Sequence, residues 1–109
     1  MIIYLISSEL NNDTLYKIGI TRRDVSKRLK QLKTGNPATL SVVKTFESKW
    51  ASKIESNLHS SYQTKNINGE WFKLEPNDVE GFEKRCQIIH NNFELLSKTN
   101  TWVIDKNKF

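Results

Sequence analysis

Apolar and polar residues in the first half of the chain alternate in a way that predicts three β-strands. Ile2 to Ser7 and Leu15 to Ile20 are short β-favouring runs, and the polar stretch between them is rich in Ser, Asn and Asp, which favour turns. Leu40 to Phe46 is rich in β-branched residues and alternates loosely. The first two runs predict an antiparallel hairpin, and the third predicts a further strand.

Helix signals lie between and after these strands. Asp24 can cap a helix that runs from Val25 to about Thr34, and Gly35 can end it, because glycine readily takes the left-handed conformation that closes a helix. A second, amphipathic helix is expected from Lys49 to Tyr62, with Ser48 placed to cap its start. Its apolar positions recur at spacings of three and four residues: Ala51, Ile54, Leu58 and Tyr62.

The clearest periodic element is a helix in the last third of the chain. Asn77 and Glu80 form an Asn-x-x-Glu capping pattern after Pro76. The apolar residues that follow at spacings of three and four are Val79, Phe82, Cys86, Ile89, Phe93 and Leu96. In the tail from Thr101 to Phe109, the run Trp102-Val103-Ile104 could add a small strand or pack across the core.

Length and cysteine content fit one domain without covalent cross-links. A chain of 109 residues can bury roughly two-thirds of its unfolded surface, which suffices for a single core. Cys86 is the only cysteine, so an internal disulfide and a cysteine-based zinc site are excluded. We expect one α/β domain at residues 1–109, with a small three-stranded, mainly antiparallel sheet flanked by helices. Its core would lie at about residues 1–75, and an extra C-terminal helix and tail at 76–109.

The short apolar runs argue against a membrane protein. The longest contain only four to six residues, and the N-terminus lacks the basic region and longer apolar region of a signal peptide. We therefore expect no membrane partner and a cytoplasmic location in a bacterial cell. Lysine exceeds arginine and asparagine is abundant, a bias typical of AT-rich coding sequence, so a phage origin is also considered.

Charge favours an anionic partner. Lys and Arg number 17 against 12 Asp and Glu, which gives a net charge of +5. Between residues 22 and 33, where Asp24 is the only acid, the cations are Arg22, Arg23, Lys27, Arg28, Lys30 and Lys33. Phosphate binding would use cations at this density. A solvated helix face is the alternative interpretation of the same cluster.

Five spaced motifs resemble those of the GIY-YIG nuclease superfamily, in particular a compact branch of it. In chain order they are Tyr4, Lys17-Ile18-Gly19-Ile20-Thr21, Arg28, Glu55 with His59 four residues on, and Gly69-Glu70-Trp71-Phe72. The resemblance covers about residues 1–75. It implies a divalent-metal-dependent DNA endonuclease that hydrolyses phosphodiester bonds. Since the residues after the resemblance amount to one helix and a short tail, we expect sequence specificity to be low, or to be supplied by DNA structure or a partner.

The resemblance also implies a role for each site residue. Glu55 would hold one Mg²⁺ or Mn²⁺ ion, with water completing the coordination shell. Arg28 would neutralise charge that develops on the phosphate, and Tyr4 would position or deprotonate the attacking water. His59 would orient a water of the ion's shell, accept a proton or contact DNA. Taken singly, each of these residues would be an ordinary core or surface residue, so the prediction depends on their joint occurrence in this order.

Two positions depart from the superfamily pattern. Lys17 stands where the second tyrosine is expected, and a one-residue bulge could bring the neighbouring Tyr16 into that position. Lys17 itself would supply positive charge beside Tyr4 and a phosphate oxygen, or would act as a proton acceptor. Where superfamily members usually carry an asparagine downstream of the glutamate, this chain offers Glu70, which would replace it or brace the strand.

DNA binding is expected through the phosphate backbone. The candidate contacts are Arg22, Arg23, Lys27, Lys30 and Lys33, which would position the substrate without reading its sequence. If about four to six phosphates are neutralised, log affinity should fall against log salt with a slope of roughly −4 to −5.

Other functions stay open on the sequence. A domain of the same fold could have lost efficient catalysis and bind nucleic acid as a regulator or inhibitor, and a protein-interaction module is a third interpretation. Because one site cuts one strand at a time, double-strand cleavage would need a homodimer, for which the last helix is a candidate, or sequential nicking.

Overall fold

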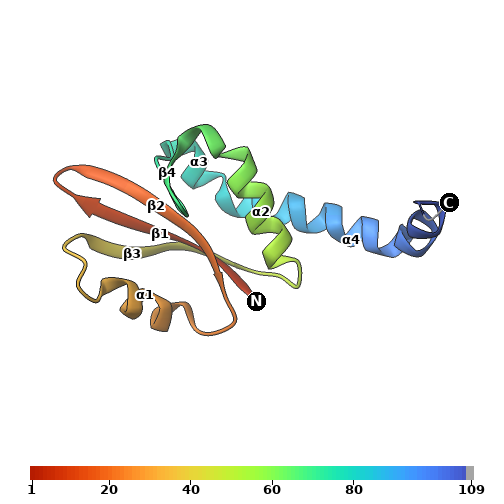
Figure 1. Cartoon of the computed structure of the whole chain (residues 1–109), viewed down its shortest axis with the longest axis horizontal. Helices are drawn as coiled ribbons and strands as arrows, with labels where there is room; N and C mark the ends of the chain where they lie inside the picture. Colours follow the sequence, from red (N-terminus) through yellow and green to blue (C-terminus); the bar gives the residue numbers. More distant parts are fainter. Residues whose placement is uncertain (108–109) are drawn as a thin grey trace.

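The computed structural model describes the backbone of residues 1–107 and the side chains of residues 1–98. Its centre is an antiparallel sheet of five strands in the order β3-β1-β2-β5-β4, accompanied by helices (Figure 1). The strands are β1 (Ile2–Leu10), β2 (Asp13–Thr21), β3 (Thr39–Glu47), β4 (Asn66–Asn68) and β5 (Trp71–Phe72). The mixed α/β class and the antiparallel pairing are confirmed. The sheet has five strands instead of the expected three, because β4 and β5 are too short to show alternation in the sequence.

The register of the β1–β2 hairpin decides which residues share a face. Tyr4 pairs with Gly19 and Ile6 pairs with Lys17, without a register shift along the hairpin. Since side chains alternate between faces, Lys17 lies on the Tyr4 face, while Tyr16 packs into the core on the other face. The irregularity in this part of the sheet lies in the β1–β3 pairing instead. The bulge that could have brought Tyr16 into the Lys17 position is therefore absent from β2.

Two apolar cores cover the two faces of the sheet. The larger core places α2 (Ala51–Ser61) and α4 (Phe82–Asn107) against one face of β1 and β2, through residues such as Ile54 and Cys86. The smaller core places α1 (Val25–Lys33) against the other face, where Tyr4, Ile6 and Val25 are buried together. Tyr4 therefore lies between the sheet and α1, and the larger core supports the same strands from the other face.

The first helix follows its capping signals, and the second begins differently. Asp24 Oδ1 accepts a hydrogen bond of 3.0 Å from the Ser26 amide, and Gly35 has a φ of +71° just after α1 ends. The N-cap of α2 is Trp50, without a side-chain cap. The prediction that Ser48 caps this helix was therefore wrong. Its Oγ accepts the Trp50 amide at 2.9 Å and shapes the turn that precedes the helix.

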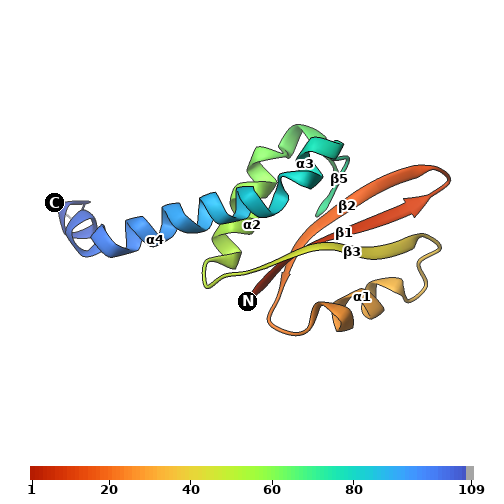
Figure 2. The same cartoon turned by 180° about the vertical axis from the view of Figure 1, so that it is seen from behind.

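The last helical segment is broken and longer than expected. Gly81 separates α3 (Pro76–Glu80) from α4, and α3 is capped by Glu75 and Asp78, so the predicted Asn77–Glu80 capping pattern was wrong. The backbone of α4 is helical through Asn107 and extends away from the sheet (Figures 1 and 2). This rules out the small strand suggested for Trp102-Val103-Ile104, whose side chains lie outside the described residues. Among the described residues, no helix is both long and apolar enough to cross a bilayer.

Candidate active site

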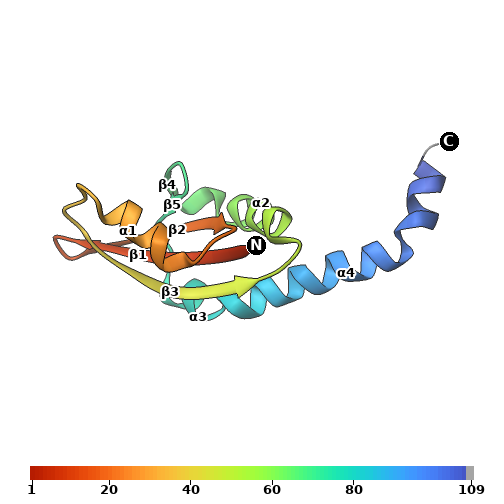
Figure 3. The ribbon, with the colours of Figure 1, turned by 90° about the horizontal axis from the view of Figure 1, so that it is seen from below.

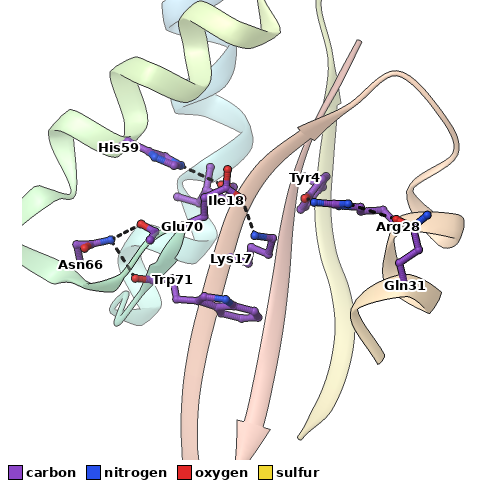
Figure 4. A network of polar contacts seen from close by, with 10 residues as sticks. Tyr4, Lys17, Ile18, Arg28, Gln31, His59, Asn66, Glu70 and Trp71 are labelled. Carbon is purple, nitrogen blue, oxygen red and sulfur yellow. Dashed lines mark hydrogen bonds and ion pairs between the residues drawn. The ribbon is translucent and has the colours of Figure 1, made fainter. Parts of the chain in front are cut away.

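Tyr4 and Arg28 form the first part of the candidate site. Arg28 Nε donates a hydrogen bond of 3.3 Å to the hydroxyl oxygen of Tyr4, and Arg28 Nη1 donates to Gln31 Oε1 at 3.2 Å (Figure 4). The bond to Tyr4 raises the pKa of Arg28, with a further contribution from the charge of Glu70. The guanidinium is thus held in one orientation at the edge of a buried phenol.

Gly19 explains how Tyr4 fits there. Tyr4 is only 1% exposed, and its ring lies against the backbone of the strand beside it. A Cβ atom at Gly19 would come within 2.6 Å of Tyr4 Cζ and closer still to the hydroxyl oxygen. The glycine is therefore required by the close approach of the phenol, and its φ is not in the left-handed region.

Lys17 and Glu70 form a partly buried ion pair, with Lys17 on the same face of the sheet as this phenol. Lys17 Nζ lies 2.5 Å from Glu70 Oε1, with side-chain exposures of 10% and 39% for the two residues. The ammonium also lies 5.7 Å from the centre of the Trp71 ring. The Glu70 carbonyl oxygen accepts a bond of 3.2 Å from the Ile18 amide. Glu70 therefore braces β2 through its backbone and holds Lys17 through its carboxylate.

Glu55, on α2, carries the most unusual polar atom of the site. Its Oε2 is buried and has no hydrogen-bond partner among the described residues. Burial raises the pKa of this carboxyl group, the charge of Glu70 raises it further, and His59 and Lys17 act in the opposite direction. The charges of Glu70, His59 and Lys17 therefore all influence the ionisation of Glu55.

This environment suits a bound hard cation. A buried carboxylate oxygen without a donor is costly, and a divalent metal ion would satisfy it with the oxygen ligand that Mg²⁺ and Mn²⁺ prefer. In the part of the chain that the structure describes, no three His, Cys, Asp or Glu side chains gather to hold a metal among themselves. Glu55 would accordingly act as a single protein ligand, with water in the other positions.

His59 is tied to β2, the central strand of the sheet. Its Nε2 lies 2.9 Å from the carbonyl oxygen of Ile18, so this nitrogen must carry the proton and donate. The ring meets Phe72 edge to face, with centroids 5.0 Å apart. It lines a hollow of about 410 Å³ together with Gln63, Asn66, Gly69 and Phe72.

The basic residues of α1 and the loop before it divide into two groups. Arg23 and Lys27 line a polar hollow of about 360 Å³ together with Arg28. Arg22, Lys30 and Lys33 are exposed but do not line this hollow. Of the five predicted DNA contacts, two therefore lie beside Arg28 in one concave surface.

The candidate residues form a band that passes over β2, from Tyr4, Lys17 and Arg28 on the α1 face to Glu55 and His59 on α2, which packs against the other face. Figure 4 shows Arg28 and Tyr4 at one end, Lys17 between them and the hairpin that β4 and β5 form, and His59 at the other end. Glu70 connects the two halves electrostatically, since its charge raises the pKa of both Arg28 and Glu55. The sequence analysis did not predict the Lys17–Glu70 ion pair. The position of Lys17 within an apolar strand could have indicated it, because a buried lysine needs a carboxylate partner.

Comparison with known proteins identifies the family of the chain. The family model of the T5orf172 domain matches residues 1–87 and so includes every residue of the site described above. The chain belongs to the T5orf172 domain family. Neither a curated protein nor a solved structure matches it at a significant level. In this T5orf172 domain, the match ends within α4, just before Ile89, which is the last buried residue of that helix among those described.

Proposed function

We propose that this T5orf172-domain protein is a divalent-metal-dependent DNA endonuclease of the GIY-YIG type, with low sequence specificity. The observation that carries the proposal is the buried Oε2 of Glu55, which lacks a hydrogen-bond partner among the described residues. Burial raises the pKa of this carboxyl group, and an apolar or amide side chain would avoid the cost of burying the charge. A cation-binding role accounts for it.

The chain's own residues would divide the work of phosphodiester hydrolysis. Mg²⁺ or Mn²⁺ held by Glu55 would polarise the scissile phosphate and stabilise the leaving oxygen. Arg28, which keeps its charge throughout, would bind the phosphate oxygens with the donors that Tyr4 and Gln31 leave free. The Tyr4 hydroxyl oxygen, which accepts a hydrogen bond from Arg28, would position the attacking water or, as the phenolate, take a proton from it and become the phenol.

Lys17 and His59, which both lie beside the β4–β5 hairpin, would support this chemistry. Lys17 brings a positive charge to the Tyr4 face of the sheet, and Glu70 fixes its position. An electrostatic role suits Lys17 better than a proton-accepting one, because its Nζ already makes an ion pair with Glu70 Oε1 at 2.5 Å. His59 has one nitrogen committed to Ile18, so only its Nδ1 could exchange a proton or contact the substrate.

A second candidate function has its own supporting observation. The charge of Lys17 is neutralised by Glu70, and Tyr4 is almost completely buried. A domain of the same fold that binds DNA without cutting it efficiently, as a regulator or inhibitor, would also tolerate this arrangement. The two functions differ in turnover and can be separated by one assay.

The test is cleavage of supercoiled plasmid with Mg²⁺ or Mn²⁺ by the wild type, Glu55→Gln and Arg28→Ala. The matched control is Glu80→Gln, which removes an exposed glutamate from α3. We expect cleavage by wild type and control, and a loss of at least 100-fold in the other two variants, in line with the loss of a group that acts on the transition state. Nicked circles that precede linear product would indicate single-strand cuts by one site.

Binding separates the two candidates. In a gel shift at low salt, Glu55→Gln should still bind DNA, since the basic hollow beside Arg28 is untouched. Binding by the wild type without cleavage under any divalent ion would favour the regulator. Cleavage that persists in Glu55→Gln would remove the metal role of Glu55.

A further inference from the structure

The β4–β5 hairpin presents an apolar side chain at the border of the site. Ile67 lies in β4, where all three residues are exposed, and it is itself 57% exposed. The β4–β5 pairing is irregular: Asn66 is opposite Phe72 and Asn68 is opposite Trp71, so Ile67 has no partner across the ladder. Such a bulge redirects a side chain away from the sheet and is common next to active sites.

The hairpin is stiffened in a way that keeps Ile67 outside. Asn66 Nδ2 donates to the carbonyl oxygens of Gly69, at 2.8 Å, and Trp71, at 3.2 Å, so it bridges the bulge (Figure 4). Gly69 has a φ of +56°, which closes the turn. At the base, the Lys73 amide donates to the Lys65 carbonyl at 2.8 Å. An exposed isoleucine on a stiff support differs from one on a mobile loop, because little ordering entropy is lost when it binds.

The hairpin borders the candidate site directly. Its Glu70 holds Lys17, and its Asn66 and Gly69 line the same hollow as His59. Figure 3 shows the hairpin rising beside β2 and away from the body of the molecule. At the opposite end of the band lies the basic hollow of Arg23, Lys27 and Arg28. A nucleic acid whose backbone contacts the basic hollow would extend across Lys17 to the hairpin.

We propose that Ile67 is a wedge that packs against an unstacked base beside the scissile phosphate, with Asn66 as its positioning residue. This inference rests on the proposed function. Apolar wedges of this kind favour DNA that is easily unstacked, such as a mismatch, a bulge or a flexible pyrimidine–purine step. The substrate class is thus locally distorted duplex DNA, selected by deformability and not by base sequence.

The first experiment measures binding and unstacking without cleavage. Duplexes with and without a central mismatch, carrying 2-aminopurine next to the mismatch, are titrated in EDTA with wild type, Ile67→Ser, Asn66→Ala and the control Ile88→Ser. Ile88, on α4, is also exposed, at 51%, and lies outside the site. Anisotropy of a separate end label reports binding, and 2-aminopurine fluorescence reports unstacking.

We expect the wild type and Ile88→Ser to bind the mismatched duplex about fivefold or more tightly than the intact one, with a rise in 2-aminopurine fluorescence. Ile67→Ser should reduce the preference to near one and abolish the fluorescence rise, and Asn66→Ala should reduce both. Circular dichroism should show that both variants stay folded.

Each other outcome is informative. Equal preference and equal fluorescence in wild type and Ile67→Ser would overturn the wedge and leave the endonuclease proposal intact, as would a wild type that binds both duplexes equally. Absence of any DNA binding by the wild type would overturn the wedge and the proposed function together. Loss of mismatch preference in Ile88→Ser as well would show that exposed apolar side chains act nonspecifically, and would also overturn the wedge.

Discussion

Glu55 is a residue at which the proposed function would oppose stability. Its carboxylate is partly buried, one oxygen has no partner among the described residues, and the charge of Glu70 is nearby. These features disfavour the charged form in the folded protein. We therefore expect that the chain is less stable with the ionised carboxylate than it would be without it.

Glu55→Gln should raise stability at neutral pH in the absence of metal. Removing the buried charge should add on the order of 1 kcal/mol to the free energy of unfolding, which raises the Tm of a domain of this size by about 4 °C. Thermal unfolding in EDTA, with Glu80→Gln as the control, measures the change. A Tm equal to or below that of the wild type would contradict the prediction.

The same gain should vanish in acid. The folded pKa of Glu55 is raised above its ordinary value of 4.5, so the penalty is fully present above the folded pKa and is lost as the pH falls below 4.5. The Tm values of wild type and Glu55→Gln should therefore converge as the pH is lowered. Mg²⁺ or Mn²⁺ should raise the Tm of the wild type and leave that of Glu55→Gln unchanged.

Gly19→Ala should damage the site through Tyr4. The new Cβ would require the buried phenol to move, which costs about 1–3 kcal/mol by overpacking and draws the hydroxyl away from Arg28. Urea unfolding and plasmid cleavage measure the two effects. Combining the change with Tyr4→Ala should be less than additive, because the clash disappears with the ring; strict additivity would argue against direct contact as the cause.

At the scale of elements, the ion pair of Lys17 and Glu70 holds the β4–β5 hairpin against β2. Glu70→Gln leaves a buried ammonium without its partner, and partial exposure of the Glu70 side chain limits the loss to about 1–2 kcal/mol. Adding Lys17→Met should restore much of this, since the unpaired charge is gone. Urea unfolding of the two single variants and the double variant tests this, and a double variant less stable than Glu70→Gln would contradict it.

The sequence predicted the longer elements well and the short ones poorly. The β1–β2 hairpin and α1 were predictable because alternation, Asp24 and Gly35 act locally. The capping of α3 by Glu75 and Asp78 was missed, because several polar residues near Pro76 offer equivalent patterns. The positions of β4 and β5 are set by contacts with β2 and by the Asn66 side chain, which connects residues that no local period relates.

For the site, the motif order indicated which residues to examine, and the structure indicates how they are held. Tyr4 and Lys17 share one face because the register of the β1–β2 hairpin places them there, and Arg28 joins them because α1 packs against that face. The burial of Glu55 Oε2 and the hydrogen bond from His59 to Ile18 depend on how α2 packs beside β2. The sequence pattern alone does not specify that packing. The catalytic assignments stay predictions that the cleavage assays address.

At the scale of the whole molecule, the folding unit extends past the family match. Beyond residue 87, Ile89 is buried in the larger core, Phe93 stacks on Trp50 at 5.8 Å, and His90 Nδ1 lies 2.7 Å from Ser48 Oγ. Trp50 Nε1 also donates to a Glu94 oxygen at 3.1 Å. The first half of α4 is therefore part of the domain's core.

A chain that ends at residue 87 should be much less stable than one that ends at residue 98. Loss of Ile89 alone is worth about 2–5 kcal/mol, a large share of the 5–15 kcal/mol that typically stabilises a domain. The longer chain keeps all of the contacts named above. Chemical unfolding of both chains measures the difference, and equal midpoints would show that these contacts contribute little.

The hydrogen bond from His59 to the Ile18 carbonyl has a consequence for proton movement. The donating nitrogen carries a hydrogen both in this neutral tautomer and in the imidazolium ion, so gain or loss of a proton at the opposite nitrogen leaves the bond intact. The bond that attaches α2 to β2 therefore does not depend on which partner the opposite nitrogen meets.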